Sequence, residues 1–452
     1  MKTTVPRIVL AGTNSGCGKT TVTCAILQAL VNRNLQAGAL KCGPDYIDPM
    51  FHSQIIGAKS ANLDLSFFSE NTARYLLAEN SRGCALSLIE GVMGYYDGIS
   101  MDSQQASTCH VAQTTESPAV LVVNARGLAR SVLAIIEGFL HLSPRSMIQG
   151  VILNQCTPMT YSMLEKVIRE HFQGEIRPLG YLPAMPQCAL ESRHLGLITA
   201  QEVVDLKEKM QILARQAEKS LDLDGILELS RQAPDLQYTP VSLPRFQERV
   251  RIGVAKDRAF CFYYGDNLRA LEEMGAELVY FSPLEDSILP DNLQGLYLGG
   301  GYPELYGKKL SENVSMRRSV RQALEGNLPC IAECGGFMYL TEAIETYPMV
   351  GFFPGTCFDT GKLTRFGYVT LQAGKDNMLC TAGESIAAHE FHHWDCTENG
   401  EDFTARKRSG KTWSCVHATN TLYAGFPHFH FYAQPSFVQG FYEACRKELH
   451  HD

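Results

Sequence analysis

The residue types near the start of the chain are those that bind phosphate. A glycine-rich loop follows the apolar run Arg7–Ala11 and precedes the helical pattern Thr20–Val31. Glycines let backbone N–H groups converge on an anion, and the helix N-terminus adds a positive dipole. We therefore predict an ATP site formed by Gly12, Thr13, Asn14, Gly16, Gly18, Lys19, Thr20 and Thr21.

Two side chains of this loop have distinct expected roles. Lys19 would bridge the outer phosphates, and the Thr20 hydroxyl would bind Mg²⁺. Gly12 stands one residue earlier than the strict GxxxxGKT spacing requires, but Gly16 completes a Gly-x-Gly-Lys-Thr-Thr variant. The alternative interpretation is a glycine-rich turn that binds no ligand.

Carboxylates follow the second and third predicted strands, Ala37–Lys41 and Ala85–Glu90. Ligands gather at the carboxyl ends of strands in open parallel sheets, and Mg²⁺ requires hard oxygen donors. The candidates at these ends are Asp45, Asp48, Glu90 and Asp97. Helix capping or a solvated loop charge is the alternative role for each of them. Asn154 ends a further predicted strand, where its amide could contact adenine or only form a turn.

A second reactive pattern surrounds Cys334, which ends the apolar run Cys330–Glu333 and precedes two glycines. This pattern resembles a nucleophile elbow, in which small neighbours permit a strained turn at a helix N-terminus. The helix dipole is expected to lower the pKa of the thiol. The backbone N–H groups of Gly300, Gly301 and Gly335 are candidates for an oxyanion hole. The alternative is that Cys334, like many cysteines, only fills space in a core.

A nucleophilic thiol needs a base, and the sequence offers two groups of histidines. His428 and His430 lie in a Pro-His-Phe-His-Phe segment near the C-terminus. The competing group is His389, His392 and His393.

Composition excludes several classes of protein. The 452 residues suffice for two or three domains, and the net charge of −8 argues against a nucleic-acid partner. The fifteen cysteines lack zinc-ligand spacing. No signal peptide or membrane-spanning stretch is evident, so we expect a cytoplasmic protein with free thiols.

The elements that must position these residues alternate between short apolar runs and helical patterns. This alternation predicts a doubly wound, mostly parallel α/β sheet in the first half. Strand patterns restart at Val250–Ala255, after a proline-containing segment, and predict a second α/β domain. We therefore expect domains at 1–198 and 249–452, joined by a helical segment and linker at 199–248.

Six blocks of the chain, in this order, resemble those of the cobyrinate a,c-diamide synthase family, and the resemblance covers nearly the whole chain. The blocks are GTNSGCGKTT, KCGPDYIDP, LIEGVMGYYDG, LESRHLGL (190–197), LYLGGGYPEL and AECGGFMYL. The family implies a dethiobiotin-synthetase-like P-loop domain with a parallel sheet, followed by a class I-type glutamine amidotransferase α/β domain. The blocks also resemble the related enzymes that act on hydrogenobyrinate and on nickel-sirohydrochlorin.

The resemblance implies a role for each candidate residue. Cys334 becomes the glutaminase nucleophile and His428 its base, with His430 as the alternative. The glutaminase triad often has a Glu two residues after the His, where this chain has His430, so a Cys–His dyad is expected. ATP would bind with Mg²⁺, the metal held by Thr20, Asp45 and Glu90. Asp48 and Asp97 would handle the carboxylates of a tetrapyrrole substrate.

The implied chemistry is ATP-dependent amidation of the a and c carboxylates of a corrinoid, with L-glutamine or ammonia as nitrogen source. The enzyme would be a glutamine-hydrolysing carbon–nitrogen ligase of cobalamin biosynthesis. Ammonia released by one domain would travel unprotonated to the other. A different class, a regulatory P-loop ATPase with an inert second domain, is the competing hypothesis, and a homodimer is compatible with the pattern.

Overall fold

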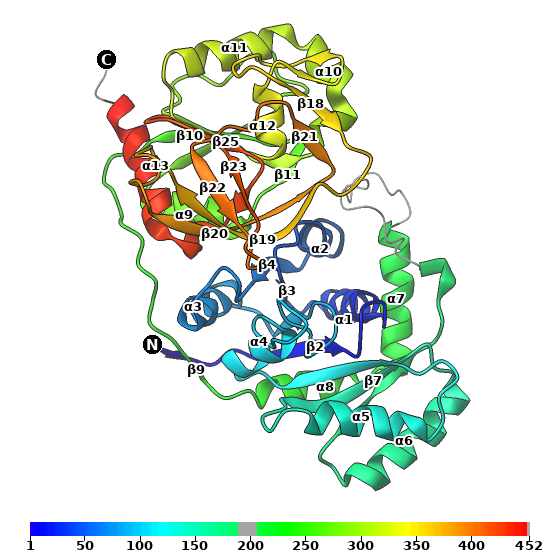
Figure 1. Cartoon of the computed structure of the whole chain (residues 1–452). Coiled ribbons are helices and arrows are strands. Elements are labelled where there is room, and N and C mark those ends of the chain that lie inside the picture. Colours follow the sequence, from blue (N-terminus) through cyan, green and yellow to red (C-terminus); the bar gives the residue numbers. More distant parts are fainter. Residues whose placement is uncertain (189–205, 450–452) are drawn as a thin grey trace. The chain divides into compact units, whose positions relative to one another are not determined.

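The computed structural model describes residues 1–188 and 206–449 and divides into two compact units, Met1–Val241 and Ser242–Asp452 (Figure 1). The family block at 190–197 and the expected boundary at 198 lie outside the described residues. Each unit has its own sheets and its own buried core.

A parallel sheet forms the centre of the N-terminal unit. Among the described residues, seven strands lie in the order β4-β3-β5-β2-β6-β7-β8, and every neighbouring pair is parallel. The strands are β2 (Arg7–Gly12), β3 (Ala37–Cys42), β4 (Lys59–Leu63), β5 (Leu86–Glu90), β6 (Ala119–Asn124), β7 (Ile148–Asn154) and β8 (Arg177–Leu182). They are buried runs, as expected for a sheet covered by helices on both faces.

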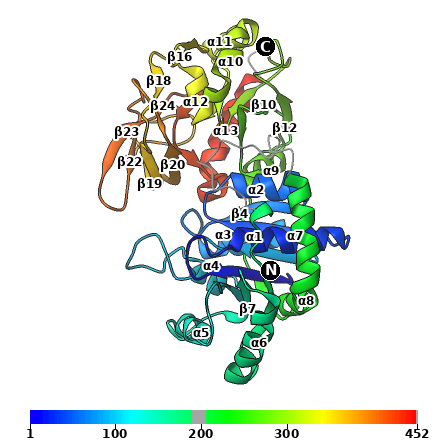
Figure 2. The same cartoon turned by 90° about the vertical axis from the view of Figure 1, so that its right-hand side faces the viewer.

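Helices connect these strands. They are α1 (Lys19–Asn32), α2 (Ile47–Phe51), α3 (Glu70–Asn80), α4 (Thr108–Thr114), α5 (Ser131–His141), α6 (Pro158–Phe172), α7 (Leu206–Ser220) and α8 (Leu223–Arg231). Helix α7 runs beside α1 (Figures 1 and 2), and its apolar residues Met210 and Leu213 belong to the same core as Ile26. The α7–α8 segment is therefore an integral layer of this unit.

The two ends of the N-terminal unit are joined. Strand β1 (Lys2–Thr3) pairs antiparallel with β9 (Leu236–Gln237). The Arg7 side chain is fully buried and donates hydrogen bonds to four carbonyl oxygens, those of Val5, Thr115, Glu116 and Pro234. A buried guanidinium needs such partners, because an unpaired one would be costly.

The C-terminal unit has a second sheet in the order β12-β10-β13-β15-β25-β24 within its described residues. All neighbours are parallel except β24. Its strands are β10 (Arg251–Ala255), β12 (Glu277–Phe281), β13 (Gly295–Leu298), β15 (Cys330–Glu333), β24 (His417–Ala418) and β25 (Leu422–Gly425). The helices of this unit are α9 (Gly265–Met274), α10 (Gly307–Glu312), α11 (Val314–Glu325), α12 (Gly335–Leu340) and α13 (Pro435–Glu448).

Smaller sheets complete this unit. Strands β23 (Thr412–Cys415), β22 (Phe403–Arg406), β19 (Arg365–Ala373), β20 (Ser385–His392) and β26 (His428–Phe429) form an antiparallel one. Another contains β17 (Tyr347–Pro348), β16 (Ala343–Ile344), β18 (Thr356–Asp359) and β21 (Trp394–Cys396), and it is mixed because β16 and β18 pair in parallel. A short antiparallel ribbon pairs β11 (Phe260–Phe262) with β14 (Gly300–Gly301). The predicted pair of α/β domains is confirmed, and these smaller sheets are additions that the sequence did not predict.

Candidate active sites

The glycine-rich loop connects β2 to α1, as its sequence context predicts. Gly16 and Gly18 have φ values of 78° and 102°, which glycine adopts without the penalty that a Cβ imposes. The Lys19 Nζ donates hydrogen bonds to the carbonyl oxygens of Asn14 and Met93. The ammonium group therefore lies over the loop, which is the location that a phosphate-binding lysine requires.

Asn154, at the end of β7, braces this loop. Its Nδ2 donates a hydrogen bond to the Cys17 carbonyl oxygen over 2.9 Å. A Cβ on Gly18 would lie 1.9 Å from the same nitrogen, so only glycine fits there. The amide that the sequence suggested for adenine is thus in contact with the loop backbone.

The first helical residue after Lys19 contacts the end of β5. The Thr20 hydroxyl donates to Glu90 Oε1 over 2.6 Å, and Lys41 Nζ on β3 lies 3.0 Å from the same oxygen. Lys41 also pairs with Asp48 Oδ2 at 2.6 Å. His52 Nε2 lies 3.5 Å from Glu90 Oε2. The structure therefore brings the predicted Thr20, Asp48 and Glu90 together, with Lys41 and His52 added.

Burial and charge compete in this cluster. Burial acts to lower the pKa of Lys41, but the carboxylates of Glu90 and Asp48 outweigh it and hold that pKa above its ordinary value. Burial opposes ionisation of Asp48, yet the Lys41 charge lowers the pKa of that carboxyl. Burial lowers the pKa of His52. The cluster therefore contains charged Lys41 and Asp48 beside a neutral imidazole at pH 7.

Asp45 and Asp97 both accept hydrogen bonds from the backbone. Asp45 Oδ1 accepts from the N–H groups of Ile47, at 2.7 Å, and Asp48, so it caps α2. Burial, followed by the charge of Asp48, raises the pKa of Asp45 to about 6. Asp97 Oδ2 accepts from the Gly94 N–H over 2.8 Å. Capping and ligand binding remain compatible, because each carboxylate has a second oxygen.

The donor set at Thr20 and Glu90 suits Mg²⁺. A hydroxyl and a carboxylate are hard oxygen ligands, and no described residue hydrogen-bonds Glu90 Oε2. The described part of the chain holds no cluster of three or more His, Cys, Asp or Glu arranged for a metal. A site with so few carboxylates is typical of Mg²⁺ that is bound partly by the protein and partly by the phosphates of the substrate.

Cys334 occupies a strained turn between β15 and α12. Its φ of 50° and ψ of −104° lie outside the regions that non-glycine residues favour. Its N–H donates to the Gly425 carbonyl oxygen over 2.7 Å, and its own carbonyl accepts from Met338. A Cβ on Gly336 would lie 2.1 Å from the Leu298 carbonyl oxygen, so this turn requires a glycine there. These features match the predicted nucleophile elbow.

The predicted oxyanion residues lie beside this elbow. A Cβ on Gly335 would approach the Gly301 nitrogen to 3.0 Å, which shows how closely the two backbones pass. Gly300 and Gly301 are held by the β11–β14 ribbon, where they pair with Phe262 and Phe260. The loop that could stabilise an oxyanion is therefore fixed by backbone pairing.

The five histidines that were candidates for the base differ in their surroundings. A Cβ on Gly300 would lie 2.5 Å from His428 Cε1 and 3.3 Å from its Nε2, so the Nε2 edge faces the glycine loop. His430 Nε2 lies instead 3.7 Å from Asp266 Oδ2. The ring of His389 stacks on His428 at 5.1 Å, and that of His392 on Phe426 at 4.2 Å. His393 is half-buried.

The thiol of Cys334 differs from expectation. Burial, followed by the charge of Glu304, raises the pKa of Cys334 above its ordinary value. The predicted lowering by the helix dipole is wrong, because the desolvation of a buried thiolate outweighs the short helix α12. Burial also raises the pKa of Glu304 to about 7. A neutral thiol needs a base before it can act as a nucleophile, and the Nε2 edge of His428 borders the same glycine loop.

Comparisons with known proteins cover both units. Residues 8–197 match the CobQ/CobB/MinD/ParA nucleotide binding domain, and residues 251–436 match the CobB/CobQ-like glutamine amidotransferase domain. The cobyrinate a,c-diamide synthase of Clostridium acetobutylicum is 38% identical over 437 residues, covering 96% of this chain and 98% of its own length. This chain belongs to the cobyrinate a,c-diamide synthase family.

A second cobyrinate a,c-diamide synthase also matches nearly the whole chain. The synthase of Listeria innocua is 37% identical over 453 residues, covering 98% of this chain and 100% of its own length. Among solved structures, MinD of Aquifex aeolicus covers 50% of this chain and 95% of its own at 15% identity and a TM-score of 0.29. The predicted family and fold class are confirmed by the relatives and the domain matches.

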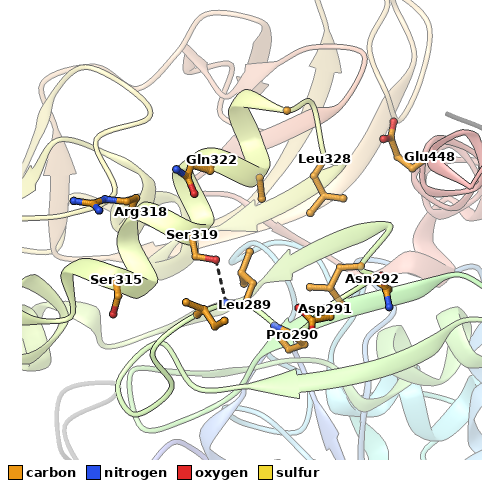
Figure 3. A pocket seen from close by; sticks show the side chains of 14 residues that line it. Leu289, Pro290, Asp291, Asn292, Ser315, Arg318, Ser319, Gln322, Leu328 and Glu448 are labelled. Atoms are coloured by element: carbon orange, nitrogen blue, oxygen red, sulfur yellow. Dashed lines mark hydrogen bonds between the residues drawn. The ribbon is translucent and has the colours of Figure 1, made fainter. Parts of the chain in front are cut away.

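One hollow of this family member lies away from the predicted residues. It has a volume of about 680 Å³ and is lined by residues from the loop before β13, from α11 and from α13, including Leu289, Arg318 and Glu448 (Figure 3). The Ser319 hydroxyl accepts a hydrogen bond from the Leu289 N–H across it (Figure 3). None of the predicted site residues lines this hollow. Among the described helices, none combines the length and apolar character needed to cross a bilayer.

Sequence reasoning missed three residues that this family member brings to its sites. Lys41 and His52 surround Glu90, and Glu333 lies 3.6 Å from His428 Nδ1. Lys41 could have been predicted from the sequence. It ends a predicted buried strand, and a buried lysine needs a charged or hydrogen-bonding partner. His52 and Glu333 carry no comparable local pattern.

Proposed function

We propose that the chain is a glutamine-hydrolysing carbon–nitrogen ligase that amidates the a and c carboxylates of cobyrinate, a step of cobalamin biosynthesis. The observation that carries this proposal is the elbow at Cys334, with His428 against Gly300, in a chain that also carries a phosphate loop at Lys19. Relatives named for this reaction match nearly its full length.

The N-terminal unit would activate the carboxylate. A carboxylate resists attack by ammonia because oxide is a poor leaving group, whereas an acyl phosphate releases phosphate. Backbone N–H groups of Gly12, Thr13, Asn14, Gly16, Gly18 and Thr21 would hold ATP. Lys19 would neutralise the transferring phosphoryl group, and Asn154 would keep the loop in shape. Mg²⁺, bound by Thr20, Glu90 and Asp45, would offset charge on the phosphates.

Asp48 and Asp97 would orient the substrate carboxylates and the ammonia. Asp48 is paired with Lys41, so its position depends on a cation that a substrate carboxylate could share. Asp97 closes the turn at Gly94, beyond the end of β5. Asp48 and Asp97 are thus the two residues to which we assign contact with the tetrapyrrole.

The C-terminal unit would release the ammonia. The Cys334 thiol transfers its proton to His428 Nε2 while its sulfur attacks the side-chain amide carbon of L-glutamine. The N–H groups of Gly300, Gly301 and Gly335 would stabilise the resulting oxyanion. The C–N bond then breaks, and ammonia leaves with the proton from His428. Water cleaves the thioester to give glutamate and restores the thiol.

A substrate panel tests the proposal. Cobyrinate, hydrogenobyrinate and nickel-sirohydrochlorin are each incubated with the protein, ATP, Mg²⁺ and glutamine, and masses report one or two amidations. We expect two additions on cobyrinate. Amidation of only one of the other two tetrapyrroles would assign the chain to that related reaction. ADP release that is independent of glutamine and of every tetrapyrrole would instead indicate a regulatory ATPase.

The cellular location and the oligomeric state are also part of this proposal. The enzyme would work in the cytoplasm, where ATP and glutamine are available. A homodimer is the assembly to test first, and the mass measured by light scattering would decide it.

A further inference from the structure

We infer that Glu333 is a positioning residue for His428, taking the place of the carboxylate that the expected Cys–His dyad lacks. This inference rests on the proposed glutaminase activity. Glu333 directly precedes Cys334 at the end of β15 and is 1% exposed. Its Oε2 lies 3.6 Å from His428 Nδ1.

The carboxylate of Glu333 is held from two sides. Its Oε1 accepts a hydrogen bond from the Phe429 N–H over 3.3 Å, and its Oε2 accepts one from the Tyr297 hydroxyl over 3.2 Å. Asn267 fixes the same segment, because its Oδ1 accepts from the Phe431 N–H over 2.8 Å. Glu333 is thus anchored to the strand that carries His428.

The two nitrogens of the His428 ring face different groups. Nδ1 faces Glu333, while the Nε2 edge lies against Gly300 of the glycine loop. A carboxylate at Nδ1 selects the tautomer with a proton on Nδ1, in which Nε2 carries the lone pair that can accept the thiol proton. Catalytic hydrogen bonds are often long without substrate and shorten in the complex, so 3.6 Å is compatible with this role.

The residue two positions after His428 contacts a different carboxylate. His430 stands there, and its Nε2 lies 3.7 Å from Asp266 Oδ2 on α9. Asp266 and His430 thus form a buried histidine–carboxylate pair whose geometry is similar to that of Glu333 with His428. The pair at His428 adjoins the nucleophile through the peptide bond between Glu333 and Cys334, and the other pair provides a matched control.

Burial shifts the pKa values of several titratable groups around His428 in the direction that favours their neutral forms. Burial, followed by the positive form of His428, lowers the pKa of His389, which stacks on it. Burial raises the pKa of Tyr297 and of Tyr423 well above their ordinary values. Cys334 is a thiol for the reason given above. Glu333, whose Oε2 lies 3.6 Å from Nδ1, is placed to offset the charge of an imidazolium at His428.

The test compares E333Q and E333D with D266N, using the full chain and glutamate release from glutamine. E333Q should lose about 100-fold to 10,000-fold in kcat/KM for glutamine, because an amide donor at Nδ1 favours the wrong tautomer. E333D should recover part of the rate, with the acidic limb of its pH profile shifted from wild type. D266N should keep the rate of wild type, and ammonia-dependent amidation should be unchanged in all three variants.

Three outcomes would overturn the inference. E333Q could retain at least half of the wild-type kcat/KM, or D266N could lose as much as E333Q, which would indicate a general packing effect. If E333Q does not fold, E333D decides: a wild-type rate with an unshifted acidic limb overturns the inference, and a lower rate with a shifted limb supports it. Absence of glutamine hydrolysis by the wild-type protein would instead refute the proposed function.

Discussion

The hydroxyl of Thr20 donates a hydrogen bond to Glu90 Oε1 over 2.6 Å, across 70 residues of sequence. This contact joins the first turn of α1 to the carboxyl end of β5. It places a hydroxyl and a carboxylate where Mg²⁺ could bind both, next to the phosphate loop. The proposed ATP chemistry depends on this pair, and a conservative pair of variants can test it.

Thr20→Ala should reduce amidation about 100-fold or more with glutamine and with ammonia, because it removes an oxygen ligand from phosphoryl transfer. Thr20→Ser keeps the hydroxyl and is the matched control, with an expected loss of less than about tenfold. Both variants should still hydrolyse glutamine. Normal turnover of Thr20→Ala with ammonia would show that this loop is not the ATP site.

Cys334→Ala should abolish glutamine-dependent amidation, because it removes the thiol at the elbow between β15 and α12 that would form the thioester. Amidation driven by ammonium salts at alkaline pH should persist, since the thiol only releases ammonia. The assay measures diamide by mass with each nitrogen source. A folded variant that had lost both activities would contradict the proposed separation of roles.

Glu304→Gln should make Cys334 more reactive toward iodoacetamide, because the Glu304 charge contributes to the raised pKa of the thiol. The pKa of Glu304 is about 7, so the wild-type carboxyl is mostly neutral at pH 6 and mostly charged at pH 8. The ratio of variant to wild-type alkylation rates should therefore rise between pH 6 and pH 8. Peptide mass spectrometry would resolve Cys334 from the other cysteines, and a ratio that is flat or falls with pH would refute the prediction.

Lys41→Met should destabilise the N-terminal unit by about 3–5 kcal/mol, because it leaves two buried carboxylates, Asp48 and Glu90, without their cation. Hydrogen exchange in β3 and β5 would report the loss, with β10 as an internal control. Lys41 lowers the pKa of Asp48, so its stabilising effect is present at neutral pH and declines with acidification. The difference between variant and wild type should therefore shrink below about pH 4.

The sequence predicted most of what is local in this structure. The loop at Lys19 and the elbow at Cys334 each join a buried strand to a helix, and such patterns are complete within about ten residues. Strands β2, β3, β5, β10 and β15 begin and end within one residue of their predicted bounds. Carboxylates at strand ends were predicted to gather, because the parallel sheet brings those ends to one edge.

What the sequence did not predict depends on contacts between distant segments. Glu333 was assigned to a strand, but its contact with His428 spans two sheets whose register no local pattern specifies. The sequence also did not predict the stacking of His389 on His428, because this contact requires the antiparallel pairing of β20 with β26. The raised pKa of the Cys334 thiol depends on burial, which a linear pattern does not measure.

The pairing of β1 with β9 has a consequence for biosynthesis. While the protein is being translated, β1 lacks its partner until Gln237 has emerged from the ribosome. Arg7 likewise lacks one of its four carbonyl acceptors until Pro234 appears. The nascent chain must therefore carry β1 without its partner strand, and Arg7 without one of its acceptors, through more than half of its synthesis. Contacts this distant in sequence form slowly, which makes this interval the time of greatest exposure to aggregation.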